Sequence, residues 1–208
     1  MPDSSPQSRP VGVAVFLLIA GALGLLAAWS LTIDKLALLA DPDFVPSCDV
    51  GVLVGCGVNL GSWQGAVFGF PNPLIGLMAW PVVIAIGAAI LAGAQFARWF
   101  WIAFNVGVAG ALVFVGWLIA QSIYALDVLC PWCMLTWAVT IPTFWVVTLH
   151  NLRTGNLPVS ARMQRLAGEW FKWIPLITVV CYAIVIVLAQ AQMNAIPRVM
   201  IDLQNLFR

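Results

Sequence analysis

Five apolar runs, separated by shorter polar segments, fill most of the chain after residue 10. The first run, Val11 to Ile33, carries no charged residue. A helix needs about 20 residues to cross the hydrocarbon core of a bilayer, so this run predicts a membrane span. It is longer than the apolar region of a cleaved signal peptide, about 7–15 residues, so we interpret it as a retained anchor. The remaining runs predict spans over residues 74–94, 102–122, 131–149 and 173–189.

Composition supports this pattern. Hydrophobic residues make up 62% of the 208-residue chain, charged residues only 8%, and the mean hydropathy is +1.00. A soluble core of this size cannot bury so much apolar surface, so the sequence predicts an all-α integral membrane protein. The formal net charge of +1 and the lack of a long basic stretch give no indication of nucleic-acid binding.

Positive charges indicate how the five spans are oriented. If the N-terminus is cytoplasmic, that side holds six of the nine basic residues, namely Arg9, Arg98, Arg153, Arg162, Arg165 and Lys172. The opposite side holds the other three and six of the eight acidic residues. Because Lys and Arg concentrate on the cytoplasmic side, we expect five spans with the N-terminus inside.

This topology divides the chain into four parts. Residues 1–10 form a disordered cytoplasmic lead, and residues 11–150 form a four-helix core with an outer loop over 34–73. The second half of that loop, rich in Gly and Pro, predicts a short helix in the membrane interface rather than a span. Residues 151–172 form a cytoplasmic loop, and residues 173–208 form the fifth span and a tail. The tail either forms a short amphipathic helix or frays.

The candidate chemistry lies in the cysteines. Cys48 and Cys56 fall in the outer loop, whereas Cys130 and Cys133 begin the fourth span on the same side. Disulfides form and persist on the outer side of the cytoplasmic membrane, so both pairs can be oxidised. Cys181 lies within the fifth span, where we expect it to pack as a small apolar residue.

The segment Cys130-Pro131-Trp132-Cys133 has features of a redox dithiol. Proline is favoured at the first position of a helix, which places Cys130 at the N-cap. The helix N-terminus favours the thiolate, which is the reactive form of cysteine. Spacing alone leaves two alternatives open, static disulfides and a four-cysteine zinc site, of which the latter needs four converging thiolates. We favour redox exchange between the two pairs and predict no metal.

The combination of motifs resembles the vitamin K epoxide reductase family, in its bacterial disulfide-forming branch. The resemblance covers roughly residues 11–150. It rests on the loop cysteines, on Ser62 after them, on the Asn72-Pro73 step that opens the second span, and on the C-x-x-C of the fourth span. It implies a four-helix bundle around a quinone, either menaquinone or ubiquinone, in the bacterial cytoplasmic membrane.

The resemblance also implies roles for these residues. Cys133 would lie next to the quinone with Cys130 as its partner, Cys56 would exchange with Cys130, and Cys48 would meet an external dithiol. Trp137 is a candidate contact of the quinone, and Asn72 and Ser62 resemble residues near it. Their alternatives are an Asn-Pro turn and a hydroxyl bonded to local backbone.

Two departures from the family pattern change the expected activity. Trp137 replaces the Tyr that animal members carry, and an indole has no phenolic proton to give, so we expect quinone reduction rather than epoxide reduction. Many bacterial members continue into a thioredoxin-like domain, whereas this sequence ends at Arg208. We therefore expect a separate extracytoplasmic thioredoxin-fold protein as the partner.

The sequence thus predicts a membrane thiol oxidase that re-oxidises a dithiol protein and passes the electrons to a quinone, supporting disulfide bond formation. The alternative is a membrane scaffold or binding subunit whose disulfides are structural. Another quinone-linked thiol oxidase of bacterial membranes has its C-x-x-C in the first outer loop, so the order of pairs here is the reverse.

Overall fold

The structure, a computed structural model, describes residues 10–206, apart from the side chains of residues 203, 205 and 206. The described part is all-α, with five helical segments long and apolar enough to cross a membrane. The helices are α1 (Val11–Ala40), α2 (Gly57–Gly61), α3 (Pro73–Leu91), α4 (Arg98–Gln121), α5 (Pro131–Arg153), α6 (Ala161–Trp170), α7 (Ile174–Met193) and α8 (Ala195–Leu206). The predicted all-α membrane fold with five spanning helices is confirmed.

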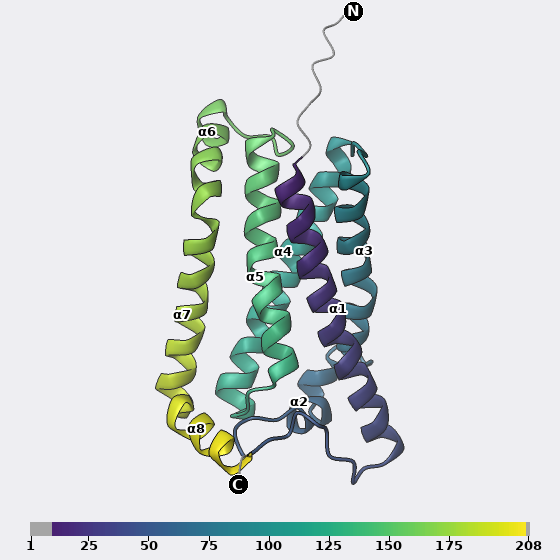
Figure 1. The fold of residues 1–208 in the computed structure, drawn as a ribbon, viewed down its shortest axis with the longest axis vertical. Helices are drawn as coiled ribbons and strands as arrows, with labels where there is room; N and C mark the ends of the chain where they lie inside the picture. The colour runs from purple at the N-terminus through teal and green to yellow at the C-terminus, as the bar shows by residue number, and fades with distance from the viewer. Residues whose placement is uncertain (1–9, 207–208) are drawn as a thin grey trace, which may run out of the picture.

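Four of the long helices form a bundle (Figure 1). Helix α1 packs along both α3 and α5, and α4 packs along α5 on the other side. Helix α7 lies outside this bundle, against α5. The predicted arrangement of a four-helix core with one extra helix therefore matches the packing.

Small residues allow α1 and α3 to approach closely. Gly24 of α1 lies against the indole ring of Trp80, and a Cβ added at Gly87 of α3 would come within 2.8 Å of the Ala14 carbonyl oxygen. Close packing of small residues is a common source of helix association in membranes, where lipid removes the hydrophobic driving force. These contacts fix the first half of α1 against the middle and the second half of α3.

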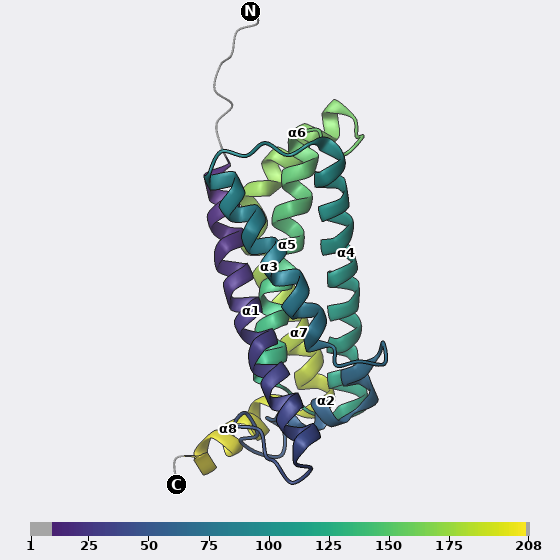
Figure 2. The same cartoon turned by 90° about the vertical axis from the view of Figure 1, so that its right-hand side faces the viewer.

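The loops divide between the two ends of the bundle (Figure 2). Helix α6 and the α3–α4 turn lie at the end where α1 begins. The opposite end holds α2, α8 and the loop that follows α1. Because α5 begins at this second end, its first residues meet the loop that follows α1.

Several helix boundaries differ from the sequence prediction. Helix α1 continues to Ala40, beyond the predicted end at Ile33, because the charged residues that follow find partners: Lys35 Nζ donates to the Leu60 carbonyl oxygen at 2.6 Å. The predicted outer loop therefore begins later than residue 34. Part of the predicted polar loop 151–172 is helical, since Ser160 caps α6 by accepting from the Met163 N–H.

The structure tests the prediction for the tail but not the prediction for the lead. Residues 195–206 form α8 rather than fraying, with exposed Ile196, Met200 and Ile201 on its surface. Residues 207 and 208 of the predicted tail lie outside the described residues, as do residues 1–9 of the predicted lead.

Candidate functional site

The C-x-x-C segment forms the start of α5, as predicted. Cys130 is the N-cap with extended backbone (φ −91°, ψ 119°), and Pro131 occupies the first helical position. The Cys133 N–H donates to Cys130 Sγ at 3.3 Å, so this sulfur takes the place of a capping oxygen. This bond satisfies one of the free N–H groups of the first turn and fixes the Cys130 sulfur at the start of α5.

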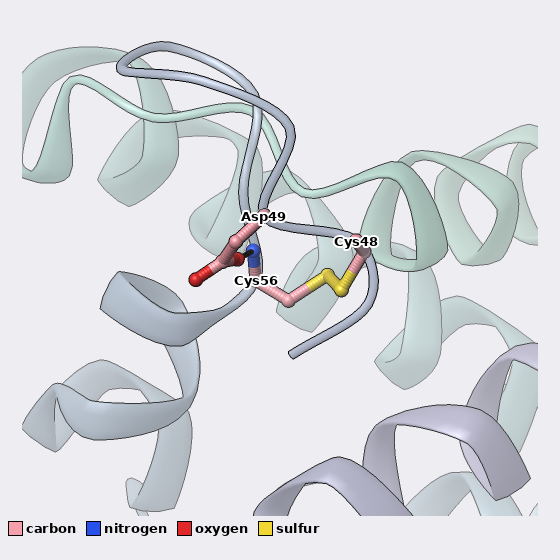
Figure 3. A group of neighbouring side chains, drawn as sticks. All are labelled: Cys48, Asp49 and Cys56. Carbon is pink, nitrogen blue, oxygen red and sulfur yellow. Dashed lines mark hydrogen bonds between the residues drawn. A yellow bond between two sulfur atoms is a disulfide. The ribbon is translucent and has the colours of Figure 1, made fainter. Parts of the chain in front are cut away.

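The loop cysteines are joined to each other. Cys48 and Cys56 form a disulfide with a Cα–Cα distance of 5.8 Å, whereas Cys130, Cys133 and Cys181 are free thiols (Figure 3). The structure thus holds an oxidised loop pair beside a reduced helix pair. Cys181 is half-buried in α7, away from the four-cysteine group.

Backbone pairing places the loop against the start of α5. Leu129 N–H donates to the Leu53 carbonyl at 2.8 Å, and Gly55 N–H donates to the Leu129 carbonyl at 3.1 Å. The residues Val54 and Leu129 thereby form a parallel bridge directly before the two cysteines Cys56 and Cys130. The pairing aligns the loop cysteine with the helix cysteine.

Asp49 fixes the last part of the loop. Its carboxylate points toward the backbone N–H of Cys56, from which Oδ1 accepts a hydrogen bond (Figure 3). Oδ1 also accepts from the Gly57 N–H at 2.9 Å. These bonds hold the turn between the disulfide and α2. Sequence reasoning missed Asp49, although an acidic residue directly after a loop cysteine is the type of residue that accepts backbone N–H groups in turns.

The central contact of the site joins the two pairs. Cys130 Sγ lies 3.2 Å from Cys56 Sγ, and both residues have 0% of their surface exposed. Thiol–disulfide exchange proceeds by attack of a thiolate on a disulfide sulfur, and these atoms are in contact. Cys48 retains 8% exposure. The geometry allows a disulfide to pass between the loop and α5 through Cys56 and Cys130.

Asp34 is a second residue that sequence reasoning missed. Its carboxylate, on the extended part of α1, is buried, and its Oδ2 lies 3.6 Å from Cys48 Sγ. The sequence predicts it as the first residue of the loop, because a charge normally ends a membrane span. The only signal in the sequence was an Asp-Lys pair that directly follows the apolar run and has apolar residues after it.

A cavity of about 600 Å³ begins at Cys133 and extends along the bundle between α3 and α4. Among the four site cysteines, Cys133 alone lines it. The walls are apolar along most of their length, from Ile75 and Val83 of α3 to Phe104 and Phe114 of α4. Most polar lining residues belong to the cysteine end of the bundle, and these are Asn59, Gln64, Asn72, Ser122 and Thr136. Thr140 and Thr143 line the cavity further along α5.

The structure separates the predicted quinone-contacting residues into two groups. Asn72 and Trp137 line the cavity. The Asn72 side chain also braces the preceding turn, because its Nδ2 donates to the Gln64 carbonyl at 2.7 Å and its Oδ1 accepts from the Val67 N–H at 3.1 Å. Ser62 is not among the lining residues, and its hydroxyl donates to the Asn59 carbonyl oxygen at 2.8 Å. The local backbone alternative describes Ser62, while its role near a quinone stays a prediction.

Asn59 is a further lining residue that was not predicted. Its Oδ1 accepts from the Ser122 hydroxyl at 3.5 Å, whereas its Nδ2 is buried without a hydrogen-bond partner. An unpaired buried donor costs about 1–3 kcal/mol. A ligand carbonyl oxygen at this end of the cavity would satisfy such a donor.

The zinc alternative required four cysteines, whereas the group of possible metal ligands in the described residues contains two cysteines and one aspartate. Cys48, Asp49 and Cys56 have their ligand atoms within 4.8 Å of one another. In this structure, however, both sulfurs belong to a disulfide and Asp49 Oδ1 binds two backbone N–H groups. A cysteine binds zinc as a thiolate, so the disulfide-bonded loop pair does not supply two of the four ligands that a four-cysteine site requires.

The fold and the cysteine arrangement define a multi-pass membrane protein with a dithiol–disulfide site. A comparison with the curated proteins finds no match. The model of the vitamin K epoxide reductase family matches residues 15–148, which is more than half of the chain and includes all four site cysteines. The chain belongs to the vitamin K epoxide reductase family, and it is accordingly a membrane oxidoreductase.

Proposed function

We propose that this protein is a quinone-dependent thiol oxidase that re-oxidises an extracytoplasmic thioredoxin-fold dithiol protein. The observation that carries the proposal is the 3.2 Å contact between the sulfurs of Cys56 and Cys130, next to a cavity that Cys133 lines. This geometry connects a loop disulfide to an apolar compartment through successive thiol exchanges.

The distribution of charge supports an outward-facing site in a bacterial cytoplasmic membrane. Basic residues concentrate at the end of the bundle opposite the cysteines, where α4 begins, α5 ends and α6 lies. These residues are Arg98, Arg153, Arg162, Arg165 and Lys172. The positive-inside rule assigns that end to the cytoplasm. The cysteine end then faces the compartment in which secreted proteins acquire disulfides.

The loop receives electrons from the partner. Cys48 retains some exposure whereas Cys56 has none, so the partner's thiolate attacks Cys48 and Cys56 leaves as a thiolate. Cys56 then attacks Cys130 Sγ in the oxidised helix pair, the Cys130–Cys133 bond breaks, and Cys133 leaves as a thiolate in the cavity. The second thiol of the partner attacks its own mixed disulfide and releases Cys48. Cys48 then attacks Cys56 in the Cys56–Cys130 disulfide, which restores the loop disulfide and releases Cys130 as a thiolate. Each step forms one disulfide bond and breaks one.

The cavity fits a quinone in size and polarity. Ligand cavities usually measure about 300–1,000 Å³, with a few polar groups in an apolar lining. Here most of the polar residues lie at the cysteine end, and the apolar walls along α3 and α4 suit an isoprenoid tail. The unpaired Asn59 Nδ2 and the second N–H of Asn72 Nδ2 are donors for a ring carbonyl oxygen. A bound quinone supplies a two-electron acceptor that restores the Cys130–Cys133 disulfide.

Filling the cavity is expected to weaken quinone binding without disturbing the thiols. Ala111 of α4 lines the cavity, so Ala111→Phe places a ring in the space for the tail. Overpacking costs about 1–3 kcal/mol, so we expect the Kd to rise about tenfold or more. Quenching of tryptophan fluorescence by a short-chain ubiquinone measures this Kd. Val113→Phe is the control, because Val113 is 74% exposed and does not line the cavity; equal Kd values for both variants would exclude this cavity as the quinone site.

The direct test of the proposed function mixes three purified components: the protein, a reduced thioredoxin-fold dithiol protein, and a soluble ubiquinone. We expect the partner's thiols to disappear only when quinone is present, with one quinone reduced per disulfide formed. If the cysteines do not change state when partner and quinone are supplied, the disulfides are static and the protein is a scaffold.

A further inference from the structure

A carboxylate near the end of the described chain contacts the cysteine loop. Asp202, on α8, is 7% exposed, and its Oδ2 accepts hydrogen bonds from the Leu53 N–H at 3.0 Å and from the Val54 N–H at 3.3 Å. These loop residues are about 150 positions earlier in the sequence. Hydrogen bonds to a charged acceptor are stronger than neutral ones, so Asp202 is a firm anchor for this part of the loop.

The anchored residues are the ones that align the two cysteines. Leu53 donates its N–H to Asp202 and accepts the Leu129 N–H through its carbonyl oxygen, so it lies between α8 and the residue before Cys130. Val54, the other anchored residue, precedes Cys56 by two positions. Movement of this segment therefore changes the distance between the sulfurs of Cys56 and Cys130.

Helix α8 is itself fixed to the bundle, as an anchor must be. The chain turns at Asn194, which has a left-handed backbone (φ 48°), and Gln190 Oε1 accepts from the Ile196 N–H at 2.8 Å. Met193 and Ala195 are buried in one apolar cluster with Leu53. Figure 1 shows α8 below α7, beside the loop at the cysteine end.

The loop is also shaped to receive the carboxylate. A Cβ added at Gly51 would overlap the carboxylate group of Asp202, so the two residues approach this closely only because position 51 is glycine. An exposed ion pair between Arg198 and Asp127, at 3.2 Å, adds a second link between α8 and the segment before Cys130. Such exposed pairs contribute little, so Asp202 is the main polar link.

We propose that Asp202 is a positioning residue for the exchange between the two cysteine pairs. It holds the loop where the Cys56 thiolate can attack Cys130 Sγ, with formation of the Cys56–Cys130 bond and release of Cys133 as a thiolate. Without this anchor the loop spends less time in contact with α5, while Cys48 stays open to an external thiol. This role rests on the proposed thiol oxidase function and lies outside the family match, which ends at residue 148.

The test uses dithiothreitol as the dithiol and a short-chain ubiquinone as the acceptor. For Asp202→Ala we expect kcat to fall about tenfold and the KM for dithiothreitol to fall with it, so that kcat/KM for dithiothreitol stays near the wild-type value, because only a step after dithiol attack is slowed. Asp202→Asn keeps an acceptor oxygen and should retain an intermediate kcat. Asp43→Asn is the control, since it removes an exposed carboxylate from the same loop.

Two further measurements separate positioning from a general structural role. Gly51→Ala pushes on the carboxylate from the loop side and should reproduce the loss of kcat. In the absence of quinone, dithiothreitol should reduce the Cys48–Cys56 disulfide of Asp202→Ala at least as fast as that of the wild type, as measured by thiol labelling. A wild-type kcat in both variants would overturn the proposal, and so would an equal slowing of loop reduction and quinone turnover.

The proposed function can fail separately from this inference. If the wild-type protein does not reduce quinone, the oxidase function is wrong. The positioning role is then measured as the yield of a Cys56–Cys130 disulfide in protein that carries Cys48→Ala and Cys133→Ala. We expect Asp202→Ala to lower that yield severalfold, and an unchanged yield would refute the role.

Discussion

Cys133→Ala is expected to reduce quinone turnover by a factor on the order of 10³ or more, as is usual when an enzyme loses a residue that takes part in covalent chemistry. Cys133 alone among the four site cysteines lines the cavity, so its thiolate is the one that can meet an acceptor there. Without it, Cys130 has no partner with which to form the helix disulfide. The measurement is the decrease in ubiquinone absorbance with dithiothreitol as the electron donor.

The control for this variant is Cys181→Ala, which removes a half-buried thiol on α7 outside the site. We expect it to turn over quinone at the wild-type rate. The loop disulfide of Cys133→Ala should remain reducible by dithiothreitol, because Cys48 and Cys56 are intact. A normal rate of quinone reduction in Cys133→Ala would remove this residue from the electron path.

The second large effect is expected for Cys48→Ala, which should abolish re-oxidation of a thioredoxin-fold partner. Cys130 and Cys56 have no exposed surface, so a protein thiolate cannot reach them directly. Removing the outer sulfur leaves the partner no loop disulfide to attack, and the remaining Cys130–Cys133 pair lies between the buried helix start and the cavity. Thiol labelling of the reduced partner over time measures the loss, which we expect to be on the order of 10³-fold or more.

Cys48→Ala and Cys133→Ala interrupt the relay at opposite ends, and their thiol states should differ accordingly. In Cys133→Ala the partner is still able to reduce the loop once, with no further turnover. In Cys48→Ala the partner remains reduced from the start. Should the partner be re-oxidised at the normal rate in Cys48→Ala, the loop is not its point of entry.

The spans were predictable because the length of an apolar run and the absence of charge reflect the thickness of the bilayer directly. Cys130-Pro131-Trp132-Cys133 was predictable as a helix start, since Pro131 suits the first helical position and the structure places Cys130 at the N-cap. Both features depend on neighbours in sequence. Local pattern was therefore a sufficient guide for them.

The extension of α1 to Ala40 was not predictable from local pattern. A charged pair normally ends a span, but here Lys35 binds the Leu60 carbonyl and Asp34 is buried beside Cys48. Both partners belong to the loop that follows, and the sequence does not show where that loop returns. The helix continues because tertiary contacts satisfy the polar groups.

Contacts between distant segments could not be predicted from the sequence either. The bonds from Leu53 and Val54 to Asp202 join residues about 150 positions apart, and nothing in either segment indicates the other. Spacing also left the cysteine pairing open. The structure contains the Cys48–Cys56 disulfide and places Cys130 against it, an arrangement that a pair of static disulfides would not require.

The central claim is that Cys56 and Cys130 exchange a disulfide, and trapping this bond tests it most directly. Protein carrying both Cys48→Ala and Cys133→Ala has no other partner for either sulfur within the site. After mild oxidation, peptide mapping without reduction should find the Cys56–Cys130 disulfide in most molecules, consistent with the 3.2 Å contact. Recovery of both residues as free thiols under conditions that oxidise the wild-type loop would contradict the relay.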